Sequence, residues 1–191
     1  MGIRLFDPLY KIMEEHGVTA LELNKDHGSH NRWRDFDEKT FILCLVRNPQ
    51  QRSISEFSHW ANYGDDGQRT HRNGRDRDCP HYTKEKFMYW LENKHIENYQ
   101  SGVIGDNLGR INKLMRVEGL RGNENDFRKR LLKELGISHE FSFYPPDYEG
   151  AFMPPEKKLN DLFNENPEFL SLLAEKNKKD AELYSQASMA F

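Results

Sequence analysis

The residues with the clearest capacity for chemistry are an arginine and two serines on either side of Asn48-Pro49. Arg47 directly follows six apolar residues, and Ser53 and Ser55 come shortly after the proline. A guanidinium binds phosphate through paired hydrogen bonds, and hydroxyls near a helix amino terminus add donors where the helix dipole favours an anion. These residue types predict a phosphate site. An arginine paired with a surface carboxylate, beside serines that merely tolerate a helix start, would give the same pattern.

A buried strand and an amphipathic helix are predicted to position these side chains. Residues 41–46 form an uninterrupted apolar run, which is typical of a strand buried on both faces in a parallel sheet. After the proline, apolar residues recur at helical spacing, at Ile54, Phe57 and Trp60 or Ala61. In α/β folds, ligands bind where such a strand ends and the next helix begins. We therefore expect an α/β fold, with a parallel sheet flanked by helices.

Two histidines, His27 and His30, lie on either side of Gly28-Ser29 and allow three interpretations. They can be solvated loop residues. They can be half of a metal site, although no second pair of ligands occurs at a suitable spacing. One of them can act as a general base, because an imidazole titrates near neutral pH. The sequence does not choose between His27 and His30 for that role.

The segment VRNPQQRSIS resembles the part of sulfotransferases that binds the 3′-phosphate of the sulfate donor, 3′-phosphoadenosine 5′-phosphosulfate (PAPS). The pattern in that family is roughly V-R-[ND]-P-x-x-R-x-x-S, and Arg47 and Ser55 match its two phosphate ligands. The resemblance implies a P-loop-like sulfotransferase fold and transfer of a sulfuryl group from PAPS to a hydroxyl, without a metal. Some carbohydrate sulfotransferases carry an H-G-H-like segment with a catalytic base, which implies that role for His27 or His30 and a carbohydrate acceptor.

Later segments resemble the same family less specifically. Gln100 falls where the family has a P-Q dipeptide, with Tyr99 in place of the proline. Residues 111–120 resemble a strand ending in R-x-E-x-L, and residues 135–137 match L-G-[IL]. Residues 173–184, LAEKNKKDAELY, resemble the carboxy-terminal helix, which usually ends in D-x-x-L-[FY]. In chain order, these segments extend the resemblance to most of the sequence.

One element of the family pattern is missing. PAPS enzymes have a strand followed by a loop rich in Gly, Lys, Ser or Thr, whose backbone amides hold the 5′-phosphosulfate. Neither G-x-x-x-x-G-K-[ST] nor P-K-x-[GA]-[ST]-[ST] occurs in this sequence. We expect that the sequence is an amino-terminally truncated form of such an enzyme. The alternative is a non-catalytic nucleotide- or phosphate-binding module derived from a sulfotransferase.

Local patterns predict the remaining elements. Each expected helix has an apolar stripe, a start or stop signal, or both. A short strand is also expected, and two polar or proline-rich stretches are expected to be long loops. These segments are a helix at 7–17 from Asp7 to Gly17, a strand at 18–23, helices at 83–93 and 126–135, a helix capped by Asn166, and loops at 63–82 and 138–155.

Composition limits the function class. The 191 residues fit one domain spanning 1–191. The net charge of −3 gives no general attraction to nucleic acid, so an RNA-binding protein is disfavoured. The arginines at 63–82 fit either a charge-compensated surface loop or a site for an anionic acceptor. No apolar run approaches the ~20 residues of a membrane span and no signal peptide is evident. A cytoplasmic location is therefore the default expectation, although relatives in this family are often Golgi membrane proteins.

Overall fold

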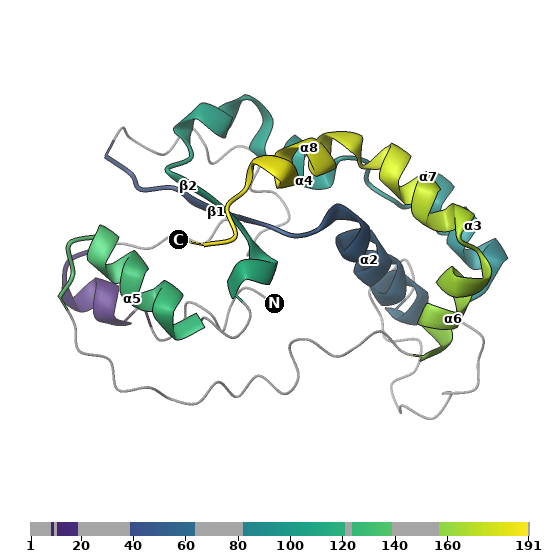
Figure 1. Ribbon diagram of the computed structural model, residues 1–191, viewed down its shortest axis with the longest axis horizontal. Coiled ribbons are helices and arrows are strands. Elements are labelled where there is room, and N and C mark those ends of the chain that lie inside the picture. Colours follow the sequence, from purple (N-terminus) through teal and green to yellow (C-terminus); the bar gives the residue numbers. More distant parts are fainter. Residues whose placement is uncertain are drawn as a thin grey trace. The chain divides into compact units, whose positions relative to one another are not determined.

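The computed structural model describes residues 9, 11–18, 39–63, 82–120, 124–138 and 157–190. In these ranges the protein is mostly helical, with a small parallel sheet of two strands, so it is a mixed α/β structure (Figure 1). The chain divides into two compact units. The first comprises Met1–Val46, Val103–Phe152 and Gln186–Phe191, and the second comprises Arg47–Gly102 and Met153–Ser185.

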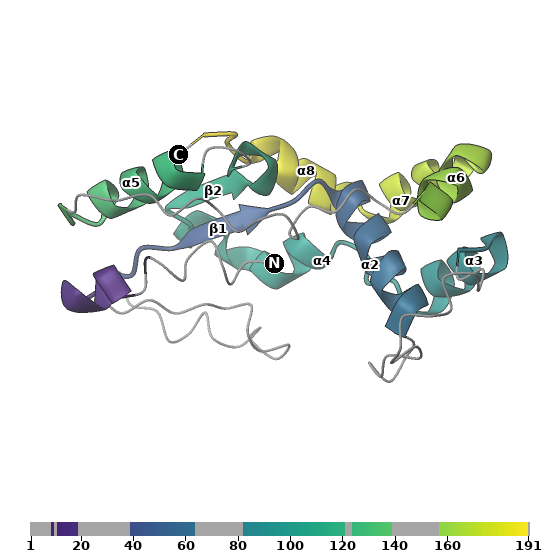
Figure 2. The ribbon, with the colours of Figure 1, turned by 90° about the horizontal axis from the view of Figure 1, so that it is seen from below.

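The sheet belongs to the first unit. β1 (Leu43–Val46) pairs in parallel with β2 (Lys113–Arg116), with Leu43 opposite Lys113 and Val46 opposite Arg116 (Figure 2). Ser188 continues the parallel pattern along β2. Its N–H donates to the Leu114 carbonyl at 3.0 Å and its carbonyl accepts from the Arg116 N–H at 2.8 Å. The predicted parallel pairing is therefore confirmed for the strands that the structure describes.

Both predicted strands are shorter in the structure. β1 starts at Leu43 rather than at residue 41, and the Ile42 N–H donates to the side-chain oxygen of Asn112 (2.7 Å). Of the four β1 residues only Val46 is buried, so the expectation of a strand buried on both faces is wrong. The strand expected over 111–120 ends at Arg116, because η4 (Val117–Leu120) is a 3₁₀ turn.

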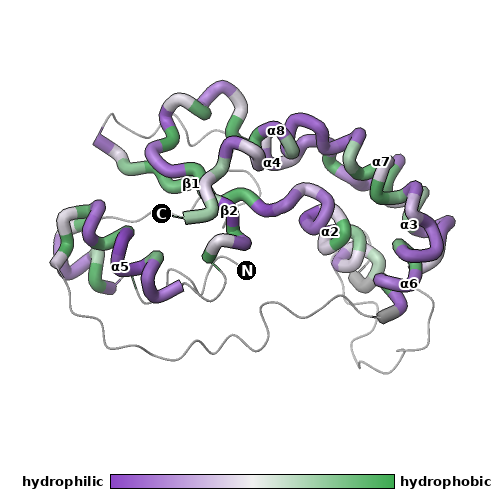
Figure 3. The backbone as a smooth tube through the Cα atoms, in the orientation of Figure 1, coloured by the Kyte–Doolittle hydropathy of each residue, from purple (hydrophilic) through white to green (hydrophobic). Residues whose placement is uncertain are grey.

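The hydrophobic core of the first unit combines the amino-terminal helix with α5 (Glu124–Glu134). The helix predicted at 7–17 is observed at residues 9 and 11–15, and the helix predicted at 126–135 is α5. Gly17 and Gly136, just after these two helices, both have φ +72°, the left-handed conformation that often ends helices. Hydrophilic and hydrophobic residues alternate along α5 (Figure 3). The buried core residues are Leu9, Ile12, Met13, Met115, Leu120, Phe127, Leu131, Leu132 and Ile137.

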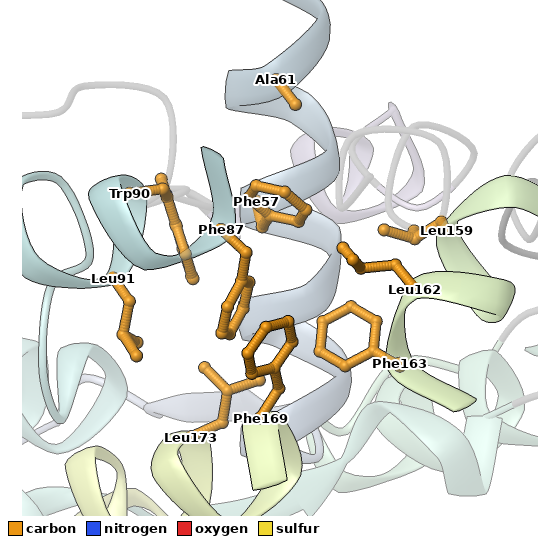
Figure 4. Packing of buried hydrophobic residues seen from close by; sticks show 10 residues of the cluster. All are labelled: Phe57, Ala61, Phe87, Trp90, Leu91, Leu159, Leu162, Phe163, Phe169 and Leu173. Carbon is orange, nitrogen blue, oxygen red and sulfur yellow. The ribbon is translucent and has the colours of Figure 1, made fainter. Parts of the chain in front are cut away.

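The second unit is built around α2 (Pro49–Tyr63), which packs against α3 (Lys84–Asn93) and α7 (Glu168–Lys176). Its core is aromatic (Figure 4). The Phe57 ring centroid lies 5.3 Å from that of Phe87 and 5.5 Å from that of Trp90, and the Phe87 and Phe169 rings stack at 4.2 Å. The helical spacing that predicted α2 and α3 therefore reflects burial against a shared core.

The carboxy-terminal helices differ from the prediction. Asn166 was expected to cap α7, but its side-chain amide donates to the Leu162 carbonyl (2.8 Å) near the end of α6 (Lys157–Glu165), a helix that was not predicted. Pro167 occupies the N-cap of α7 without a side-chain hydrogen bond. The stretch at 173–184 is also not one helix, because α7 ends at Lys176 and α8 (Lys178–Gln186) begins after Asn177.

Two further short helices are described, α4 (Tyr99–Ile104) and the 3₁₀ helix η3 (Gly105–Arg110). The loop at 138–155 and the strand at 18–23 fall almost entirely outside the described residues, as does the loop at 63–82. In the parts that are described, no helix combines the length and apolarity needed to cross a bilayer.

Candidate phosphate-binding site

Arg47 is the first residue of the second unit, and one side chain holds its backbone from both ends. The Arg47 N–H donates to Gln100 Oε1 (2.7 Å), and the Arg47 carbonyl accepts from Gln100 Nε2 (2.9 Å). A glutamine amide carries one acceptor oxygen and a donor nitrogen, so one side chain can replace the pairing that a neighbouring strand would give. The site therefore has a backbone of defined conformation at its arginine.

The helix that follows begins as predicted. Pro49 is its first residue, where a missing N–H has no cost. Asn48 caps it, because its side-chain oxygen accepts from the Gln51 N–H (3.1 Å) and its carbonyl accepts from the Arg52 N–H (2.9 Å). Arg47 therefore stands immediately before a well-formed helix amino terminus.

The two serines of the predicted site have different surroundings. Ser53 is fully buried, and its hydroxyl accepts from Asn177 Nδ2 (3.2 Å) and lies 3.4 Å from an Arg52 nitrogen. Ser55 is exposed. Two residues correspond to a rotation of about 200° around a helix, so the serines are on nearly opposite faces of α2. Only Ser55 is open to a soluble ligand, and the predicted phosphate contact of Ser53 gains no support from its position.

A fully buried carboxylate holds the segment that carries Gln100. Asp180, in α8, accepts the Gln100 N–H at Oδ2 (3.0 Å). Its Oδ1 accepts both the N–H and the hydroxyl of Ser101, each at 2.7 Å. These amides are in the first turn of α4, where helix N–H groups lack a partner within the helix. Asp180 thus acts as a cap for α4 from a distant point in the sequence.

The capping is reciprocal. Asn98, which precedes α4, has φ 51°, a left-handed conformation that asparagine tolerates better than most residues. Its side-chain oxygen accepts from the N–H of Lys179 (2.8 Å) and lies 3.4 Å from that of Asp180, both in the first turn of α8. Each helix therefore receives its cap from the other, which fixes the relative position of Gln100 and Asp180.

Arg52 connects α2 to the same cluster. Its guanidinium donates to Glu56 (2.7 Å) and to the Asn177 side-chain oxygen (3.2 Å), and its Nε lies 4.0 Å from Asp180 Oδ2. The guanidinium also lies over the Tyr99 ring, 5.3 Å from the centroid. Because arginine has donors only, it turns the oxygen of the Asn177 amide toward itself and the nitrogen away.

That orientation places the Asn177 nitrogen beside the buried side chain of His95. The Asn177 nitrogen lies 3.2 Å from His95 Nε2 and also donates to the Leu173 carbonyl (2.8 Å). An amide nitrogen only donates, so a hydrogen bond between it and Nε2 requires the proton of the neutral ring to be on Nδ1. Nδ1 lies 3.8 Å from Glu56 Oε2 and has no hydrogen-bond partner in the described structure. Burial, with added repulsion from Arg52 and Lys176, lowers the pKa of His95 to about 4. Burial also raises the pKa of Glu56, while Arg52 opposes that shift. His95 is therefore neutral at pH 7.

Sequence reasoning found part of this arrangement. Arg47 and the start of α2 were identified from the residues themselves. Gln100 and the stretch that contains Asp180 were noted only through family resemblance, and Asn177 and His95 were not assigned a polar role. The candidate bases His27 and His30 lie outside the described residues. Within the described ranges, no group of three or more His, Cys, Asp or Glu residues is arranged to hold a metal ion.

Comparison with known proteins identifies no relative of this chain. No protein-family model, no curated protein and no solved structure matches this chain.

Proposed function

We propose that this chain is a sulfotransferase that uses PAPS, with Arg47 and Ser55 as ligands of the donor's 3′-phosphate. One observation carries the proposal. Three segments that resemble the family separately are joined by hydrogen bonds around Arg47: the Arg47 segment itself, Gln100, and the helix that contains Asp180. If these resemblances had arisen by chance, we would not expect the three segments to lie together at the residue that is predicted to bind the ligand.

The geometry around Arg47 suits an anion. Its peptide is fixed by Gln100, and the amino terminus of α2 begins two residues later. Ser55 presents an exposed hydroxyl on the same helix. A guanidinium and a helix dipole favour a phosphate group, and in this proposal Ser55, the seventh residue of α2, adds a hydroxyl farther along the helix. The resemblance implies that this phosphate is the 3′-phosphate of PAPS.

The proposed reaction is an in-line transfer. The oxygen of an acceptor hydroxyl forms a bond to sulfur while the bond between sulfur and the bridging phosphate oxygen breaks. The products are the sulfate ester and 3′-phosphoadenosine 5′-phosphate (PAP). The hydroxyl proton passes to a base, for which His27 or His30 is the candidate. Binding of the 3′-phosphate contributes by orienting the donor. The resemblance favours a carbohydrate as the acceptor.

Calorimetric titration with PAP and with 5′-AMP tests the donor site. The two nucleotides differ in the 3′-phosphate, so Arg47→Ala should weaken PAP binding at least tenfold and leave 5′-AMP binding unchanged. Arg130→Ala is the matched control, because Arg130 is an exposed arginine that pairs with Asp126 in α5 (2.8 Å). Equal PAP affinity for the unmodified chain and Arg47→Ala would refute the assignment. PAP binding without transfer from PAPS to any member of a saccharide panel would favour the non-catalytic module instead.

A further inference from the structure

Asp180 is a charged side chain whose burial needs an explanation. It is fully buried, and the hydrogen bonds to its carboxylate come from Gln100 and Ser101. The Arg52 Nε is a further cationic neighbour at 4.0 Å. Burying a carboxylate is costly unless hydrogen bonds and a positive charge compensate for lost hydration. Here the compensating hydrogen bonds come from the short segment that carries Gln100.

Gln100 joins Asp180 to Arg47 through a single residue. Its backbone N–H is held by Asp180 (3.0 Å), and its side-chain amide forms both bonds to the Arg47 peptide (2.7 and 2.9 Å). A shift of the Gln100 backbone would therefore move the amide that holds Arg47. The path from the buried carboxylate to the Arg47 backbone therefore consists of three hydrogen bonds.

We propose that Asp180 is a positioning residue that acts through Gln100 to fix the Arg47 backbone, and so sets the affinity of Arg47 for a phosphate group. The statement about phosphate rests on the function proposed above. The statement about the Arg47 backbone does not, and it can be measured without a ligand.

An isosteric substitution distinguishes this role. Both oxygens of Asp180 accept from backbone N–H groups, one from Gln100 and the other from Ser101. In Asp180→Asn, the amide nitrogen must face one of these two donors, because a backbone N–H cannot reverse its role. One end of the cap is lost whichever way the amide turns, and faster exchange of the Gln100 amide shows when the lost bond is the one to Gln100. Glu182→Gln is the matched control, because Glu182 is an exposed acid on the same helix.

A second variant acts at the other end of the path. Gln100→Met keeps the length of the side chain and removes both bonds to Arg47, while the backbone bond from residue 100 to Asp180 remains. It also keeps the test valid if Asp180→Asn fails to fold. In a serial path, the double variant should lose no more PAP affinity than the weaker-binding single variant, whereas two independent structural effects should add.

The experiment measures hydrogen exchange of the Arg47 amide by NMR and PAP affinity by calorimetry, on the full chain. We expect both single variants to speed Arg47 exchange at least tenfold and to weaken PAP binding about tenfold, with Glu182→Gln unchanged. Unchanged Arg47 exchange in Gln100→Met, or in Asp180→Asn when the Gln100 amide exchanges faster, would overturn the proposal. Faster exchange with unaltered PAP affinity would overturn its phosphate part. If the unmodified chain does not bind PAP, the proposed function fails, and the exchange rates still decide whether Asp180 positions Arg47.

Discussion

The pH dependence of stability should reveal the buried histidine. The imidazole of His95 is enclosed by Asn177, the Trp90 ring (centroids 4.8 Å apart) and Glu56. Its pKa in the folded chain is about 4, against about 6.5 in an unfolded chain. Between these values the unfolded chain binds a proton that the folded chain does not bind. The free energy of unfolding must therefore fall as the pH falls from about 6.5 to about 4.

The magnitude follows from the two pKa values. From pH 7 to pH 5, the contribution of this one group to the free energy of unfolding should drop by about 2 kcal/mol. Other charges face the ring, namely Arg52, Lys176 and Glu97, together with Glu56. The raised pKa of Glu56 acts in the opposite direction, because it makes the folded chain bind a proton more readily at mildly acidic pH. A comparison of two chains that share these groups isolates the histidine.

His95→Gln is the suitable variant, since its side-chain oxygen can still accept from Asn177 and it does not titrate. Urea unfolding followed by tryptophan fluorescence gives the free energy of unfolding for both chains at pH 7 and pH 5. We expect the unmodified chain to lose about 2 kcal/mol more than the variant over this range. His16→Gln, which replaces an exposed histidine, serves as the control. An equal loss in the unmodified chain and in His95→Gln would refute the account of a buried, neutral imidazole.

Three further outcomes are expected. Ser55→Ala should weaken PAP binding in calorimetry by about 1–3 kcal/mol, the usual cost of losing a hydrogen bond to a charged group. Ser171→Ala, at an exposed position of α7, should leave PAP binding unchanged. Equal PAP affinities of the unmodified chain and Ser55→Ala would remove Ser55 from the site. In a transfer assay, His27→Ala and His30→Ala should show a loss of rate at one position without a loss of donor affinity, and full activity in both would place the base elsewhere. Phe87→Ala should lower the free energy of unfolding by about 3–5 kcal/mol, because the ring is fully buried among Phe57, Trp90 and Phe169. A loss below about 1 kcal/mol in urea unfolding would contradict that packing.

Local signals predicted the elements that depend on local physics. The start of α2 followed from Asn48-Pro49, and α3 followed from Phe87, Trp90 and Leu91 at helical spacing. The structure confirms a helix that begins at Pro49 in the first case and a buried stripe in the second, and it adds the Asn48 cap. Such features can be predicted because a cap and an apolar stripe involve residues within one or two turns of each other.

Boundaries set by distant contacts could not be predicted in this way. Residues 111–120 look like one strand, but β2 ends at Arg116 and a 3₁₀ turn follows. Gly119 lies against the backbone of Met189, so that a Cβ at this position would clash with the Met189 carbonyl. The turn thus depends on a contact with residues 70 positions later, which no local pattern records.

The polar cluster around Asn177 and Asp180 could not be predicted from the sequence for a related reason. In the sequence, Asn177 and Asp180 stand among lysines and glutamates and look like a solvated helix face. In the structure both side chains are fully buried, and their partners include Ser53 and Gln100. A buried polar residue has the same sequence letter as an exposed one, so only the fold separates them.

The location of this cluster has a physical reason. Arg47 lies between β1 and α2, Gln100 is in the first turn of α4 and Lys179 is in the first turn of α8. At each of these places the backbone has N–H groups that regular structure leaves without partners, and a buried peptide group without a partner is costly. The side chains of Gln100, Asp180 and Asn98 meet those needs. Because each bond is made by a residue that is itself held by another, Arg47 acquires a fixed backbone as a consequence of helix capping. An arginine whose backbone is held directly ahead of a helix amino terminus suits the proposed phosphate site, so the residues that stabilise the fold here also support the proposed ligand.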